Sequence, residues 1–140
     1  MTRKGRRTTA TPETGRARFK KAKRDHASAE TLLALKSDEH EAADDVAKLI
    51  IQAAIAYTDA VTAEYGGEIA QGRHAESVKV LRDALGNKLP KEQEMRLGRL
   101  LTHKETVEYG ARETTVKQVQ QLQLDLDRYA SWARELLGGS

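Results

Sequence analysis

The sequence predicts an all-α protein, an up-and-down antiparallel bundle of about four helices. Apolar residues recur at three- and four-residue steps through several long stretches, which is the pattern of helices with one buried face. No stretch alternates polar and apolar residues with the period of two that marks a strand, so we expect no sheet. A chain of 140 residues suits one domain with a sizeable core.

The first 24 residues are strongly basic, and we expect them to form a flexible arm. They carry ten basic side chains and one acidic one, a net charge of +9, whereas the other 116 residues carry a net charge of −6. Residues 1–15 are rich in Thr, Gly and Arg and cannot bury enough apolar surface to fold alone, while residues 16–36 favour helix. The predicted organisation is a partly disordered arm at 1–24 and a helical bundle at 25–140, with its core at about 38–137.

A basic arm of this kind attracts phosphate groups without reading sequence, and salt weakens the attraction. We therefore predict contact with nucleic acid. A solvated tail, or a contact with the acidic body of the same chain, remains an alternative. The predicted binding residues are Arg3, Lys4, Arg6, Arg7, Arg16, Arg18, Lys20, Lys21, Lys23 and Arg24.

The first long helix of the predicted bundle begins near Asp38 and Glu41, which form a capping-box-like start. Gly66 and Gly67 predict its end, because glycine adopts the left-handed C-terminal turn easily. The apolar stripe between them places Tyr57 in the core. Its members are Val46, Leu49, Ile50, Ala53, Tyr57 and Val61.

Three further helices follow. A periodic run from Ala75 to Leu85 predicts a short helix, and Pro90 predicts the start of the next one. The last helix begins with a capping box formed by Thr115 and Gln118. Its apolar stripe, which places Tyr129 in the core, comprises Val119, Leu122, Leu126, Tyr129, Ala133 and Leu136.

The composition excludes several kinds of site. There are no cysteines, no glycine-rich phosphate loop and no serine in a nucleophile elbow. The four histidines are dispersed and no Glu-x-x-His pair falls in the predicted bundle, so we expect no metal and no other cofactor. No apolar run approaches the roughly 20 residues of a membrane span. The N-terminus lacks the apolar segment of a secretory signal. We expect a cytoplasmic protein without membrane contact.

The stretch from residue 96 to residue 112 contains the candidate catalytic pair, Arg96 and His103. Seven positions are nearly two helical turns, so both side chains can share one face. Histidine can move a proton at neutral pH, and a cation can stabilise charge at phosphorus while an RNA 2′-hydroxyl attacks. The alternative is that Arg96 pairs with nearby glutamates and that His103 caps a helix end. The polar cluster comprises Arg96, Arg99, His103, Lys104, Tyr109 and Arg112.

Several short stretches together resemble a known family. They are Ala54-Ile55-Ala56-Tyr57, Tyr65-Gly66-Gly67, Leu100-Leu101-Thr102-His103-Lys104 and Val107-Glu108-Tyr109-Gly110. Over about residues 38–137 the chain resembles the HEPN (higher eukaryotes and prokaryotes nucleotide-binding) superfamily of small helical bundles. The resemblance implies a domain that acts on or with RNA in a toxin–antitoxin or phage-defence system. It also implies a homodimer and an antitoxin or nucleotidyltransferase partner.

Two alignments to the family pattern are open. The first places Arg96 and His103 at the catalytic Arg-x(4–6)-His motif, although Leu97 follows the arginine where the family usually has a polar residue. The second places Lys104 at the arginine position and Glu108-Tyr109 in a motif of non-nuclease members. The second fits the Tyr-Gly pair better and implies a non-catalytic RNA-associated domain. The other two hypotheses are a metal-independent endoribonuclease and a non-catalytic helical protein–protein interaction subunit.

Overall fold

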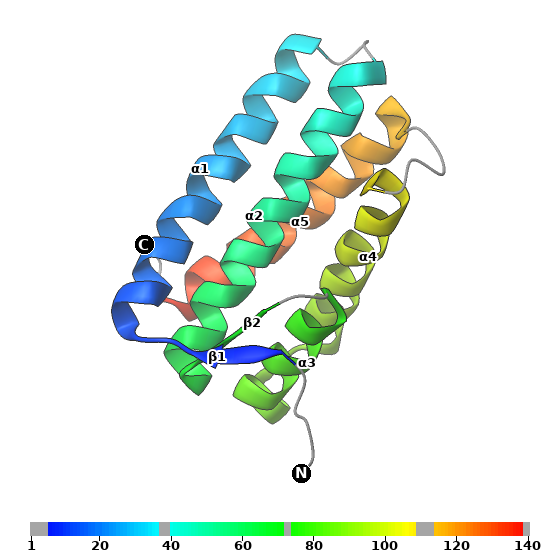
Figure 1. Cartoon of the computed structure of the whole chain (residues 1–140). Coiled ribbons are helices and arrows are strands. Elements are labelled where there is room, and N and C mark those ends of the chain that lie inside the picture. The colour runs from blue at the N-terminus through cyan, green and yellow to red at the C-terminus, as the bar shows by residue number, and fades with distance from the viewer. Residues whose placement is uncertain (1–5, 37–39, 72–73, 109–113, 139–140) are drawn as a thin grey trace.

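The computed structural model describes residues 6–36, 40–71, 74–108 and 114–138, and these are mostly helical (Figure 1). The all-α prediction is confirmed in this respect. Within the described ranges the expectation of no sheet is wrong, because two short strands pair. In chain order the elements are β1 (Arg7–Thr9), α1 (Pro12–Lys36), α2 (His40–Gly66), β2 (Glu68–Ala70), α3 (His74–Leu85), a 3₁₀ turn (Gly86–Lys88), α4 (Lys91–Glu108) and α5 (Val116–Leu136).

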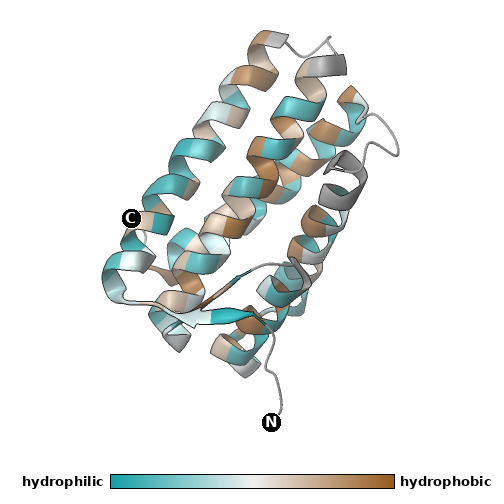
Figure 2. Cartoon of the chain, viewed as in Figure 1, coloured by the Kyte–Doolittle hydropathy of each residue, from teal (hydrophilic) through white to brown (hydrophobic). Residues whose placement is uncertain are grey.

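The central helix of the fold is α2. It packs along α1 and also contacts α5, α4 and α3 (Figure 1). The two-stranded sheet lies at the end of the molecule where α2 finishes, next to α3. Figure 2 shows that apolar residues are frequent along α2, whereas α1 is coloured mainly as hydrophilic. The basic first helix therefore covers one side of an apolar second helix.

One large apolar cluster forms the core between the helices. Tyr57 and Tyr129 are both fully buried, as the sequence predicts. Leucines of α4 and α5 and isoleucines of α2 fill the space around them. The largest fully buried aliphatic side chains include Ile50, Ile51, Leu81, Leu97, Leu100 and Leu126.

Residues 12–24 belong to the packed fold, and the expectation of a flexible arm is corrected for this part of the chain. The Oγ1 atom of Thr11 accepts a hydrogen bond from the backbone N–H of Thr14 (3.2 Å), and Pro12 suits the first helical position. The predicted boundary at residue 24 lies inside α1. Toward α2 the helix presents a stripe at alternating four- and three-residue steps, comprising Gly15, Phe19, Ala22, His26, Ala29 and Leu33.

The two strands fasten the N-terminal segment to the end of α2. They pair antiparallel, with Thr8 opposite Ile69. The side chain of Ile69 is buried in a small cluster with Ala10 and Ala63. Gly67 adopts a φ of +67°, and its N–H donates to the carbonyl of Ala63 (3.1 Å), which confirms the predicted glycine end of this helix.

Of the other predicted helix starts, two lie in the described part of the chain and one lies outside it. The capping box of α5 is confirmed, because the N–H of Gln118 donates to Thr115 Oγ1 (3.0 Å) and the N–H of Thr115 donates to Gln118 Oε1 (2.9 Å). Helix α4 begins immediately after Pro90, whose carbonyl accepts the first backbone hydrogen bonds. The predicted start at Asp38 lies outside the described residues.

One stretch of α2, Ala42–Gly66, is long and apolar enough to cross a membrane. The expectation that no apolar run reaches this length is therefore wrong. In the fold, however, 78% of the apolar window is buried against the rest of the chain. The core helix of a soluble protein meets the same criteria, so this stretch is weak evidence for a membrane span.

Candidate functional site

Arg7 is not available to bind a nucleic acid in this structure. Its side chain is only 8% exposed, and its Nη1 atom pairs with Asp83 of α3 (3.0 Å) and with Glu68 of β2 (3.5 Å). The guanidinium therefore holds β1 against two other elements. Arg7 was predicted to bind nucleic acid, but its contacts stabilise the fold instead.

Two cations of α1 also face carboxylates of the same chain. Arg18 lies 3.4 Å from Asp59 of α2, and Lys21 lies 2.6 Å from Asp25 on its own helix. Both pairs fit the alternative in which the basic segment contacts acidic groups of the same chain. Arg18 and Lys21 therefore contribute less free positive charge to the surface than the sequence alone indicates.

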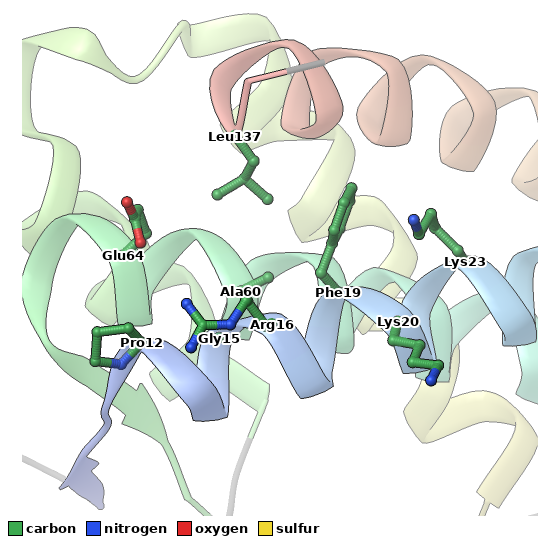
Figure 3. Close-up of a pocket in the computed structure, with 9 residues that line it drawn as sticks. All are labelled: Pro12, Gly15, Arg16, Phe19, Lys20, Lys23, Ala60, Glu64 and Leu137. Carbon is green, nitrogen blue, oxygen red and sulfur yellow. The ribbon is translucent and has the colours of Figure 1, made fainter. Parts of the chain in front are cut away.

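Arg16, Lys20 and Lys23 lie along one side of α1, four and three residues apart, and line the same pocket (Figure 3). Arg16 and Lys20 are exposed, although Arg16 also lies 3.3 Å from Glu13. The Nζ atom of Lys23 sits 4.5 Å from the centroid of the Phe19 ring, a cation–π contact. We call these three cations and the pocket beside them the basic groove.

The basic groove has an apolar floor and a volume of about 550 Å³. Phe19 and Leu137 point toward the same space in Figure 3, and the buried Ala60 of α2 also lines it. Glu64 provides an acidic group at one end. Cations with aliphatic stems beside an aromatic ring suit a ligand with phosphates and flat bases.

The remaining predicted binding residues either do not line the groove or lie outside the described residues. Arg6, next to β1, and Arg24, one turn beyond Lys20, are exposed. Arg3 and Lys4 lie outside the described residues. Part of the predicted arm is therefore helical. Its basic residues Arg16, Lys20, Lys23 and Arg24 all belong to α1.

A buried carboxyl group lies under this basic helix. Asp59 is 3% exposed, and within the described part of the chain its Oδ1 atom has no hydrogen-bond partner. Burial raises the pKa of Asp59 to about 6, although the charges of Arg18 and Lys21 oppose the rise. Its protonation therefore changes between mildly acidic and neutral pH, where it alters the pairing of Arg18.

The candidate catalytic residues Arg96 and His103 each have another partner. Arg96 is 8% exposed and its guanidinium pairs with Glu92 (2.9 Å), as the alternative interpretation of the sequence proposed. His103 Nε2 lies 3.1 Å from the hydroxyl of Thr114. Seven residues of helix separate the two along α4 by about 10 Å, and no hydrogen bond joins them among the contacts described.

The surroundings of His103 favour the uncharged form of its imidazole. Burial lowers its pKa, while the nearby charge of Asp44 opposes the effect. Asp44 also accepts a hydrogen bond from the backbone N–H of Thr114 (3.0 Å). Thr114 therefore connects both α2 and α4 to the segment before α5. The neighbouring Arg99 pairs with Asp125 of α5 (3.1 Å).

The residues of the non-nuclease alignment fall where the structure gives no side-chain contacts. Lys104 and Glu108 lie in the last turns of α4, and their side chains are outside the described part. Tyr109 lies outside the described residues altogether. The role of this motif stays a prediction.

A polar network around His26 is a feature that no sequence motif indicated. His26 is 5% exposed, with Nδ1 3.0 Å from the hydroxyl of Tyr57 and Nε2 2.8 Å from Asp127. Arg134 donates to the same hydroxyl (3.1 Å). The network joins α1, α2 and α5. The available signal was the position of His26 in the six-residue stripe of α1, one helical turn before Glu30.

Comparisons of the chain with protein-family models, with curated proteins and with solved structures found no match. The resemblance to HEPN domains is thus carried by the short motifs quoted above. Of the arrangements in the described part of the chain, the basic groove most directly matches a ligand class predicted from the sequence, because it combines exposed cations with an apolar floor.

Proposed function

We propose that the protein is a HEPN-like helical domain that binds RNA through the basic groove of α1. The observation that carries the proposal is the row of Arg16, Lys20 and Lys23 beside Phe19. At 1.5 Å per residue, the three cations follow one another along the helix at about 6 Å and about 4.5 Å. Successive phosphates of one strand can therefore each meet a cation.

Single-stranded RNA is the ligand that this arrangement favours. A protein reads unpaired bases by placing them against aromatic or apolar surface, while cations hold the backbone. The groove offers Phe19 and Leu137 for the first purpose and the three cations for the second. A duplex would present only its phosphates to this surface and leave the apolar floor unused.

The test replaces charges and leaves the fold in place, because residues 12–24 are packed against α2. The triple variant Arg16→Gln, Lys20→Gln, Lys23→Gln removes the groove cations. The control variant Lys48→Gln, Lys79→Gln, Lys117→Gln removes three exposed cations from α2, α3 and α5. Fluorescence anisotropy with a labelled single-stranded RNA, repeated over a range of salt concentrations, measures both affinity and the number of phosphate contacts.

We expect the groove variant to bind more weakly and the control to bind like the parent protein. The slope of log K against log salt should decrease in magnitude by about 2, since each lost contact to a single strand contributes about 0.7. Equal weakening of both variants would mean that only total charge matters. Unchanged binding by the groove variant would refute the proposal.

A second function, docking of a protein partner, is favoured by one exposed apolar patch. Leu35 is 75% exposed and lines a largely apolar groove of about 540 Å³ between α1 and α2, together with Leu32 and Leu49. The second copy of this chain implied by the HEPN resemblance would cover such a patch. Size-exclusion chromatography with light scattering tests it: Leu35→Ser should convert a dimer to a monomer, and a monomeric parent protein would refute it.

A further inference from the structure

Three side chains with metal-ligating atoms converge where α1 meets α5. His26 Nε2 lies 2.8 Å from Asp127 Oδ1 and 3.3 Å from Glu30 Oε1. The ligand atoms of all three residues lie within 4.8 Å of one another. His26 and Glu30 occupy successive turns of one helix face, and Asp127 approaches from the last helix. A cation bound at about 2.0–2.2 Å from each donor fits between such atoms after small side-chain rotations.

Hydrogen bonds hold His26 and Asp127 in position, and the adjoining pocket leaves room for an ion and its water ligands. His26 is held through Nδ1 by the Tyr57 hydroxyl, and Asp127 accepts a hydrogen bond from Gln123 (3.0 Å). Hydrogen bonds from neighbouring residues orient the ligands of metal sites in this way. The side chains of Glu30 and Asp127 are 60% and 46% exposed, so an ion can reach them from solvent. They border a pocket of about 360 Å³ that can hold additional water ligands.

We propose that His26, Glu30 and Asp127 form a binding site for a divalent transition-metal ion of the Zn²⁺ class. One imidazole nitrogen and two carboxylates are a donor set that suits Zn²⁺, whereas Mg²⁺ prefers oxygen ligands alone. The two carboxylates balance the charge of the ion. This site is separate from the basic groove and from the RNA binding proposed for it.

The cation of Arg134 is the main feature that opposes such an ion. Its guanidinium lines the same pocket but is directed to Tyr57, donating to the hydroxyl at 3.1 Å and lying 5.9 Å from the ring centroid. Glu135 also lines the pocket and offsets this charge. The charges around the site therefore still permit a bound divalent cation.

Metal binding requires a change of tautomer at His26. A carboxylate only accepts hydrogen bonds, so without metal the proton is on Nε2 and is donated to Asp127, while Nδ1 accepts from Tyr57. To coordinate, Nε2 must release this proton to solvent. Nδ1 takes up one proton from solvent in exchange and donates it to the Tyr57 oxygen, so the imidazole stays neutral. The tautomer thus distinguishes a metal ligand from a histidine that serves only the fold.

The test uses Zn²⁺ alone, added to the full chain after treatment with a chelator. The sequence has four histidines, so the triple variant His40→Asn, His74→Asn, His103→Asn leaves His26 as the single imidazole. We expect titration calorimetry to show one Zn²⁺ per chain in this variant, with a higher thermal unfolding midpoint in its presence. Nitrogen NMR of the imidazole should show the proton moving from Nε2 to Nδ1.

The carboxylate variants locate the ion. In the single-histidine background, Asp127→Asn and Glu30→Gln should each weaken Zn²⁺ binding at least tenfold, because each removes a charged ligand. Asp45→Asn, which removes an exposed acid of α2, should leave the affinity unchanged. Absence of stoichiometric binding in the single-histidine variant, or binding that survives both carboxylate variants, would overturn the proposal.

Discussion

Gly15 of α1 faces Ala63 of α2 so closely that a Cβ atom at residue 15 would lie 3.3 Å from the Cβ of Ala63. The same atom would lie 3.6 Å from the carbonyl oxygen of Ala60. Few real Cβ contacts are this short, so the two helices meet here nearly backbone to backbone. Close approach at this point brings the basic face of α1 beside the end of α2, where the basic groove forms.

A large side chain at residue 15 should therefore separate the two helices. We expect Gly15→Leu to lower the free energy of unfolding by about 1–3 kcal/mol, the usual effect of overpacking. Gly98→Leu is the matched control, since a Cβ at this helical glycine meets nothing within 4 Å. Urea unfolding followed by circular dichroism measures both. Equal stability of the two variants would contradict the close contact.

Asp59 should make the stability of the protein depend on pH. Burial raises its pKa from the usual 3.8 of an aspartate to about 6. Between these values the folded state binds more protons than the unfolded state, so stability relative to Asp59→Asn falls as pH rises. We expect the difference between the two proteins to change by about 2 kcal/mol from pH 4 to pH 7, because the unfolded carboxyl is already more than half ionised at pH 4.

The measurement compares urea unfolding of the parent protein and of Asp59→Asn at several pH values. The exposed Asp45→Asn serves as control, and its difference from the parent should stay flat. A constant difference for Asp59→Asn across the range would show that the buried carboxyl does not titrate there.

The Tyr57 hydroxyl should stabilise the junction of three helices. Removing it in Tyr57→Phe leaves His26 Nδ1 and Arg134 without this partner, which should lower the free energy of unfolding by about 1–3 kcal/mol. Tyr65→Phe is the control, because Tyr65 is 39% exposed and its hydroxyl donates only to the carbonyl of Leu136. We expect that change to stay below about 1 kcal/mol. Similar losses in both variants would argue against a buried network.

The pair Arg96 and His103 provides a test of catalysis. Because Arg96 is paired with Glu92 and His103 contacts Thr114, we expect purified protein to leave total RNA intact in the presence of a chelator. Gel analysis of a time course, run beside His103→Ala, measures this. Cleavage that the substitution abolishes would establish a metal-independent nuclease and the first alignment to the family pattern.

The parts of the fold that the sequence predicts well are those with strong local signals. The apolar stripes of α2 and α5 place Tyr57 and Tyr129 in the core. Thr115 and Gln118 mark a helix start through contacts only three residues apart. In each case the information lies within a few turns of helix, so a single stretch of sequence is enough.

The packed first helix and the sheet depend on contacts between distant parts of the chain. The stripe of α1 uses Gly15, Ala22 and Ala29, whose small side chains add little hydrophobicity but allow close packing. Each strand has only three residues, too few to show a period of two. The cluster of His26, Glu30 and Asp127 combines residues about 100 positions apart. Local periodicity marks the buried face of α1 only weakly, and it reveals neither the strand pairing nor the approach of Asp127 to His26.

The pairing of β1 with β2 has a consequence for the order in which the molecule folds. Arg7 and Glu68 are 61 positions apart, so their strands can meet only after α1 and α2 have docked or after a long loop has closed at an entropic cost. The helices make their contacts across one short connection and can assemble first. We therefore expect the strand pair to form last during folding and to separate first during unfolding. Loosening it should accelerate unfolding and leave the folding rate nearly unchanged.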